Sequence, residues 1–137
     1  MDLITGWDFT IYRHRRAAVE HVRKVKPKLI IGSPECTMFS TLQNPSKNMR
    51  KEGFEEKVKE AIGHVKFVTE LYAMQIKEGR WLLHEHPAGA SSWGLEEIKK
   101  IERETGVRIR TADQCMYGLK TWGRDKTKKD KYARKKV

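Results

Sequence analysis

The hydrophobic and polar positions of this chain follow two patterns, which predict helices separated by short strands. Apolar residues recur at helical spacing over three segments, and compact apolar runs lie between them. The predicted helices cover residues 13–26, 54–76 and 95–105. The predicted strands cover residues 3–5, 28–32, 80–84 and 107–112. Pro27 ends the first helix, and Gly79 follows the long helix as its C-cap.

The order of these elements predicts a parallel sheet. Strands that alternate with sheet-spanning helices form right-handed crossover units, and such units build parallel sheets. The chain has no internal repeat and no linker rich in Pro, Gly or Ser. Its 137 residues, 38% of them hydrophobic, suffice for one modest core. We therefore predict a single α/β domain over residues 1–119, with a small parallel sheet flanked by helices in a Rossmann-like arrangement.

The net charge of +11 is concentrated at the C-terminal end of the chain. Residues 120–137 hold nine Lys or Arg against two Asp and carry +7, so the other 119 residues carry only +4. Such a basic tail either stays solvated and disordered or contacts the phosphates of a nucleic acid. The candidate phosphate contacts in the tail are Arg124, Lys126, Lys128 and Lys129.

The distribution of apolar residues and cysteines indicates a soluble, intracellular protein. No apolar run approaches the roughly 18 residues that a membrane-spanning helix needs, and the N-terminus lacks the layout of a secretory signal. Cys36 and Cys115 lie far apart without Cys-x-x-Cys spacing, so we expect two reduced thiols. We expect no membrane partner, and the choice between cytoplasm and nucleus or nucleoid stays open.

Chemically versatile side chains follow the predicted strands at their C-terminal ends. The four strands are followed in turn by Asp8, by residues 34–40, by residues 84–87 and by residues 113–115. Ligands of open parallel sheets gather at the carboxyl ends of the strands. One rim of the predicted sheet therefore collects two thiols, two imidazoles and several carboxylates, and this rim is the candidate site.

Four segments of this rim resemble motifs of the cytosine-5 DNA methyltransferases. Residues 32–40, Gly-Ser-Pro-Glu-Cys-Thr-Met-Phe-Ser, look like the family's Gly-Gly-Pro-Pro-Cys-Gln-x-Phe-Ser loop. Residues 82–87 resemble its strand ending in Glu-Asn-Val, and residues 6–10 are similar to its Gly-Asp-Ile-Thr segment. Residues 112–119 look like the stretch leading into its Tyr-Gly-Val-Pro-Gln motif. The order and the approximate spacing agree over most of the chain.

This resemblance implies an S-adenosylmethionine-dependent transferase that methylates cytosine in nucleic acid, with DNA the expected polymer. It implies that Cys36 is the nucleophile and that Glu85 holds N3 of the cytosine. Asp8 and Pro34 would lie near the cofactor, and Ser40 would contact the nucleic acid. Carbon 6 of cytosine is a poor electrophile, so a thiolate and a proton donor at N3 together suit this reaction.

The chain also departs from the family pattern. No Gly-rich strand turn precedes residue 6, no target-recognition region follows, and Glu35 stands where the family has Pro. A carboxylate beside a thiol disfavours the thiolate unless the carboxylate points away. The sequence therefore predicts a truncated or partial methyltransferase-like protein. It is either a fragment, or a half-site completed by a second chain or an upstream segment, or a fold kept for binding without catalysis.

Two other interpretations of the chain stay open. Thiolates and imidazoles are good zinc ligands, although alternate residues of an extended segment point to opposite sides. The zinc ligands would be Cys36, His84, His86 and Cys115. A nucleic-acid-binding module without catalysis would instead use the basic tail, cations of the first helix and indoles that stack on bases. Its further contacts would be Arg13, Arg15, Arg16, Arg23, Trp93 and Trp122.

Overall fold

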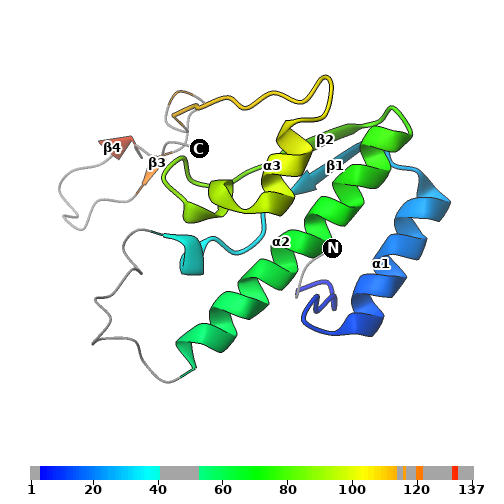
Figure 1. The fold of residues 1–137 in the computed structure, drawn as a ribbon, viewed down its shortest axis with the longest axis horizontal. Coiled ribbons are helices and arrows are strands. Elements are labelled where there is room, and N and C mark those ends of the chain that lie inside the picture. Colours follow the sequence, from blue (N-terminus) through cyan, green and yellow to red (C-terminus); the bar gives the residue numbers. More distant parts are fainter. Residues whose placement is uncertain (1–3, 41–52, 114–115, 117–119, 122–130, 133–137) are drawn as a thin grey trace.

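The computed structural model describes residues 4–40, 53–113, 116, 120–121 and 131–132. In this part of the chain a two-stranded parallel sheet packs on helices, as Figure 1 shows. The main elements are α1 (Tyr12–Val25), β1 (Leu29–Gly32), α2 (Phe54–Lys77), β2 (Trp81–His84) and α3 (Glu96–Glu102). Short 3₁₀ turns cover Thr37–Phe39 and Ser91–Gly94. The predicted α/β class, the parallel pairing of the two central strands and the long helix between them are confirmed.

The predicted first and last strands are wrong for the residues that the structure describes. Residues 4–6 form a turn in which the Ile4 side chain is 97% exposed. Residues 107–112 belong to no strand, because a groove of about 520 Å³ lies between this segment and β2. A strand requires a second strand to pair with, and the strand pairs found in the described part of the chain are β1 with β2 and β3 with β4.

The tail is described at only two places. Lys120–Thr121 and Lys131–Tyr132 pair as the antiparallel strands β3 and β4, in a sheet separate from β1 and β2. The predicted phosphate contacts of the tail lie outside the described residues, as do Cys115 and Trp122. The predicted boundary between domain and tail, after residue 119, also falls next to residues that are not described.

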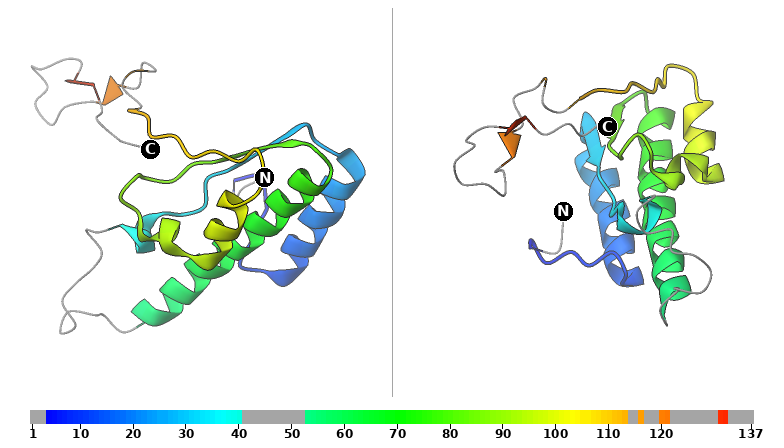
Figure 2. Two further views of the ribbon diagram at one scale, coloured as in Figure 1. Left: turned by 45° about the horizontal axis from the view of Figure 1, so that its top comes forward. Right: turned by 90° about the vertical axis from the view of Figure 1, so that its left-hand side faces the viewer.

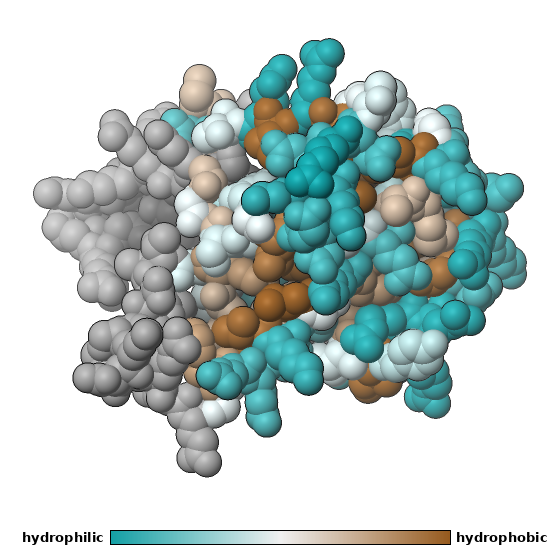
Figure 3. All heavy atoms as spheres, in the orientation of Figure 1, coloured by the Kyte–Doolittle hydropathy of each residue, from teal (hydrophilic) through white to brown (hydrophobic). Residues whose placement is uncertain are grey.

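The two faces of the β1–β2 sheet have different environments. Leu29 pairs with Trp81 and Gly32 pairs with His84. In both strands the even-numbered residues therefore lie on one face of the sheet and the odd-numbered residues on the other. Ile30 packs against the core formed with α1 and α2. On the other face Ile31 is 64% exposed and Trp81 is 75% exposed. Figure 2 shows the helices on one side of the strands, and Figure 3 shows that hydrophilic side chains surround smaller apolar areas on the helix side.

Helix α2 separates two small hydrophobic cores. The first joins α1 to α2, and the second joins α2 to α3 and to the 3₁₀ turn that contains Phe39. The first core contains Ala18, Val19, Val22, Phe67 and Leu71. The second contains Phe39, Ala61, Val65, Ala90 and Ile98. Because α2 is buried on two sides, it fixes the other elements relative to one another.

Two buried polar residues of α2 hold the strands in place. The Gln75 side-chain amide donates to the carbonyl oxygens of Pro27, at 3.0 Å, and Trp81, at 2.9 Å, where the strands begin. The Tyr72 hydroxyl lies 3.2 Å from the Gly32 carbonyl oxygen and 3.3 Å from that of Leu83, where the strands end. Both side chains are fully buried. Helix α2 therefore sets the positions of both strand ends, from which the candidate site extends.

Candidate active site

The loop that carries Cys36 begins directly after β1. From Ser33 to Cys36 exposed and half-buried residues alternate, as in an extended segment, and the chain then enters the 3₁₀ turn. The Phe39 amide donates to the Cys36 carbonyl oxygen at 3.0 Å, and the Phe39 ring is buried in the second core. Glu35 is exposed whereas Cys36 is half-buried, so the two side chains lie on opposite sides of the loop.

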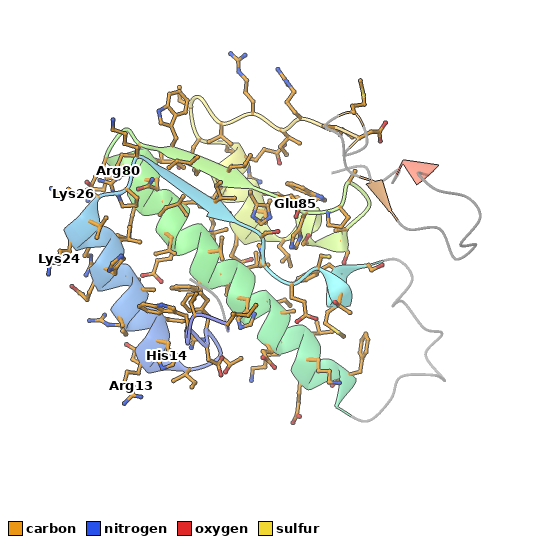
Figure 4. The ribbon with its side chains drawn as sticks, turned by 180° about the vertical axis from the view of Figure 1, so that it is seen from behind. Arg13, His14, Lys24, Lys26, Arg80 and Glu85 are labelled. Carbon is orange, nitrogen blue, oxygen red and sulfur yellow. The ribbon has the colours of Figure 1, made fainter. Side chains whose placement is uncertain are left out.

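Glu85 lies beside the start of this loop. Its backbone amide donates to the Gly32 carbonyl oxygen at 3.0 Å, which continues the pairing of the two strands by one residue. The Ser33 hydroxyl donates to Glu85 Oε2 at 2.7 Å. Figure 4 shows Arg80 near the strand starts and Glu85 near the strand ends. The predicted meeting of these two segments at one rim is therefore observed for Ser33 and Glu85.

His86 is buried and bonded through both ring nitrogens. Its exposed fraction is 1%, its Nε2 lies 2.9 Å from the Pro34 carbonyl oxygen, and its Nδ1 lies 2.5 Å from Ser92 Oγ. A carbonyl oxygen can only accept a hydrogen bond, so Nε2 carries the proton. Ser92 was not among the predicted site residues. The only sequence signal for its contact with His86 is that Ser92 lies six residues later in the chain.

His84 lies on the helix side of the sheet. Its Nδ1 lies 3.1 Å from the Tyr72 hydroxyl, and its ring packs edge-on against Trp93 with centroids 5.5 Å apart. Burial, and after it the neighbouring His86, lower the pKa of His84 to about 4, and Glu85 partly opposes this shift. The imidazole is therefore neutral at pH 7. Trp93 donates from Nε1 to the Pro87 carbonyl oxygen at 2.9 Å, so its indole is a structural group.

The zinc interpretation gains no support from the described residues. Within them no three His, Cys, Asp or Glu side chains gather as a metal site, and Cys115 lies outside them. His84 contacts Tyr72, and His86 contacts Pro34 and Ser92. Both imidazoles already have structural partners.

Asp8 stabilises the turn before α1. Its Oδ1 accepts hydrogen bonds from the Thr10 amide at 2.9 Å and the Thr10 hydroxyl at 2.6 Å. These hydrogen bonds hold the pKa of Asp8 below its ordinary value, and the bond from the Thr10 hydroxyl has the larger effect. The next residue, Phe9, lines a groove of about 350 Å³ together with Gly32 and Pro34. Asp8 and Pro34, the predicted cofactor residues, therefore lie close to one groove along β1.

The other predicted contacts are spread over the surface. Ser40 is half-buried at the end of the Cys36 loop, where its amide donates to the Thr37 carbonyl oxygen at 3.3 Å. Arg13, Arg16 and Arg23 are exposed on α1, whereas Arg15 donates to the Phe9 carbonyl oxygen at 2.8 Å.

Two further findings concern the described chain as a whole. None of its helices combines the length and the apolar character that crossing a bilayer requires. Comparisons of this chain with family models, curated proteins and solved structures gave no match.

Proposed function

We propose that this chain carries the catalytic residues of an S-adenosylmethionine-dependent cytosine-5 methyltransferase-like enzyme that acts on DNA, on part of a Rossmann-like fold. The observation that carries the proposal is the hydrogen bond of 2.7 Å between Ser33 and Glu85. It joins the loop that bears a thiol to the segment that bears a carboxyl group. These are the two groups that attack on carbon 6 of cytosine requires.

In this mechanism Cys36 Sγ forms a bond to carbon 6 while the Glu85 carboxyl group donates a proton in a hydrogen bond to N3. The electron density that the thiolate adds to the ring makes carbon 5 nucleophilic. When S-adenosylmethionine is bound, it supplies the electrophilic methyl group for carbon 5. Loss of the proton from carbon 5 then expels the Cys36 thiolate. Ser33, by donating to Oε2, orients the carboxyl group throughout.

The groove along β1 fits one end of this cofactor. Its lining is mainly apolar and includes Phe9, Ile31, Pro34 and Phe67, which suits a planar adenine. Asp8 Oδ1 is already bonded to Thr10, so Asp8 acts at this groove mainly by fixing the turn that carries Phe9. We assign no described residue to the methionine end.

A covalent trap tests this proposal. Duplex DNA carrying 5-fluorocytosine is incubated with the protein and S-adenosylmethionine, and adducts that resist denaturation are counted by gel shift and mass spectrometry. We expect an adduct with the wild type and with Cys115→Ser, the matched control, and none with Cys36→Ser. An adduct that survives Cys36→Ser, or a wild type that forms none, would contradict the proposal.

Binding of DNA without catalysis is a second candidate function, which the exposed cations of α1 favour. Arg13 and Arg16 are exposed near its start, and Lys24 and Lys26 are exposed near its end. Figure 4 shows Arg13, Lys24 and Lys26 along this helix. Phosphate contacts release counterions, so the affinity for duplex DNA would fall steeply with added salt. A binding constant that does not respond to salt would exclude this function.

A further inference from the structure

The Cys36 loop is attached at both ends to the segment that follows β2. At its start, Ser33 bonds to Glu85 and the Pro34 carbonyl oxygen lies 2.9 Å from His86 Nε2. At its end, the Ser91 hydroxyl donates to the Phe39 carbonyl oxygen at 3.3 Å. The His86 ring also packs against the Phe39 ring, with centroids 5.9 Å apart. His86 is therefore in contact with the loop on both sides of Cys36.

The two hydrogen bonds of His86 depend on each other. A neutral imidazole has one N–H and one acceptor nitrogen, and the Pro34 carbonyl oxygen requires the N–H at Nε2. In this neutral form Nδ1 is the acceptor for the Ser92 hydroxyl, whose oxygen lies 2.5 Å away. Ser92 is buried in its 3₁₀ turn. It thereby stabilises the one tautomer that can hold Pro34.

We propose that His86 is a positioning residue for Cys36, and that Ser92 assists it by fixing its tautomer. Through the Pro34 carbonyl group, His86 keeps the loop in the conformation that presents the thiol beside the Glu85 segment. A catalytic purpose for this position of the thiol rests on the proposed function. The effect of His86 on the position of the thiol does not.

The short distance along the chain makes this contact effective. Only Glu35 lies between Pro34 and Cys36, so the two residues are at most about 7 Å apart in extended chain. A small rotation at Pro34 therefore displaces the sulfur by on the order of 1 Å. A displacement of that size at a reacting atom lowers a rate by about a hundredfold.

Alkylation of Cys36 by iodoacetamide measures this placement without any methyltransferase activity. In the full chain with Cys115→Ser, His86→Leu removes the donor to Pro34 and releases the half-buried thiol. We expect alkylation to become about tenfold faster, as for one lost buried hydrogen bond. His86→Gln keeps an N–H at similar reach and should restore the rate to within about threefold. The control is His21→Gln, at an exposed position of α1, which should leave the rate unchanged.

The tautomer of His86 is a second measurement, which distinguishes a hydrogen-bonding role of the imidazole from a role in packing alone. Long-range ¹H–¹⁵N correlation spectra should show His86 neutral and protonated at Nε2, and Ser92→Ala should populate the other tautomer. A proton at Nδ1 in the wild type, or equal alkylation rates for His86→Leu and His86→Gln, would overturn the proposal. If circular dichroism shows that His86→Leu does not fold, the His86 tautomer and the alkylation rate of Ser92→Ala test the proposal in its place. If these results hold but no 5-fluorocytosine adduct forms, only the proposed function is refuted.

Discussion

Replacing Gly32 by alanine is expected to separate helix α2 from the strand end. A Cβ atom at this position would lie 2.1 Å from Tyr72 Oη, 2.9 Å from Tyr72 Cζ and 2.7 Å from Val68 Cγ1. All three distances are too short for non-bonded atoms. Tyr72 and Val68 lie one turn apart on α2, so no single side-chain rotation relieves both contacts. Either the helix moves or the strand end does.

The expected loss of stability combines two terms. Overpacking a well-filled core costs about 1–3 kcal/mol. Displacing Tyr72 also disturbs the contacts of its buried hydroxyl with the carbonyl groups of Gly32 and Leu83 and with His84 Nδ1, at a cost of about 1–3 kcal/mol. We therefore expect Gly32→Ala to lower the free energy of unfolding by about 2–6 kcal/mol, a large part of the total for a domain of this size.

Urea denaturation followed by far-ultraviolet circular dichroism measures this loss. The control is Gly63→Ala in α2, the helix that carries Tyr72 and Val68, where an added Cβ meets nothing within 4 Å. Because alanine is the better helix former, this control should gain about 0.5–1 kcal/mol. Adding Tyr72→Phe to Gly32→Ala removes the shortest contact and should recover part of the loss. A Gly32→Ala protein as stable as the Gly63→Ala protein would refute the reasoning.

Two further predictions concern other buried groups. Gln75→Leu should lower the free energy of unfolding in urea by about 2–3 kcal/mol, because the Pro27 carbonyl loses its donor. The control Ala73→Leu, at an exposed position of the same helix, should lower it little. The folded pKa of His84, about 4, lies below its unfolded value of about 6.5, so the unfolded chain binds more protons between these values. Stability should therefore fall as pH drops from about 6.5 to about 4. His84→Gln should flatten this slope and His21→Gln, at an exposed position, should not; an unchanged slope in His84→Gln would contradict the assignment.

The sequence predicted those elements whose signal is local. The run Leu29-Ile30-Ile31 and the apolar face of α2 are each strong patterns within one segment, and both elements form as predicted. Residues 4–5 and 107–112 have similar apolar character, yet they form no strand in the described chain. Strand formation depends on a partner that a single segment cannot reveal.

The candidate site was predicted as far as topology determines it. The rule that parallel strands share a carboxyl rim brought the Cys36 loop and Glu85 together in the prediction, and the Ser33 contact agrees with it. The carbonyl partners of Gln75 and His86 were not predicted, because they lie 48 and 52 residues away in the sequence. In a helical pattern a buried Gln is only an interruption of the apolar face.

The side-chain hydrogen bonds from α2 to the strands have a consequence for local opening. Since Gln75 and Tyr72 bond to carbonyl groups at both ends of the sheet, neither strand can separate without disturbing the helix. The sheet and α2 should then exchange their amide hydrogens as one cooperative unit. Both segments of the candidate site extend from this unit, so their relative motion on shorter timescales depends on the few contacts between the loops themselves.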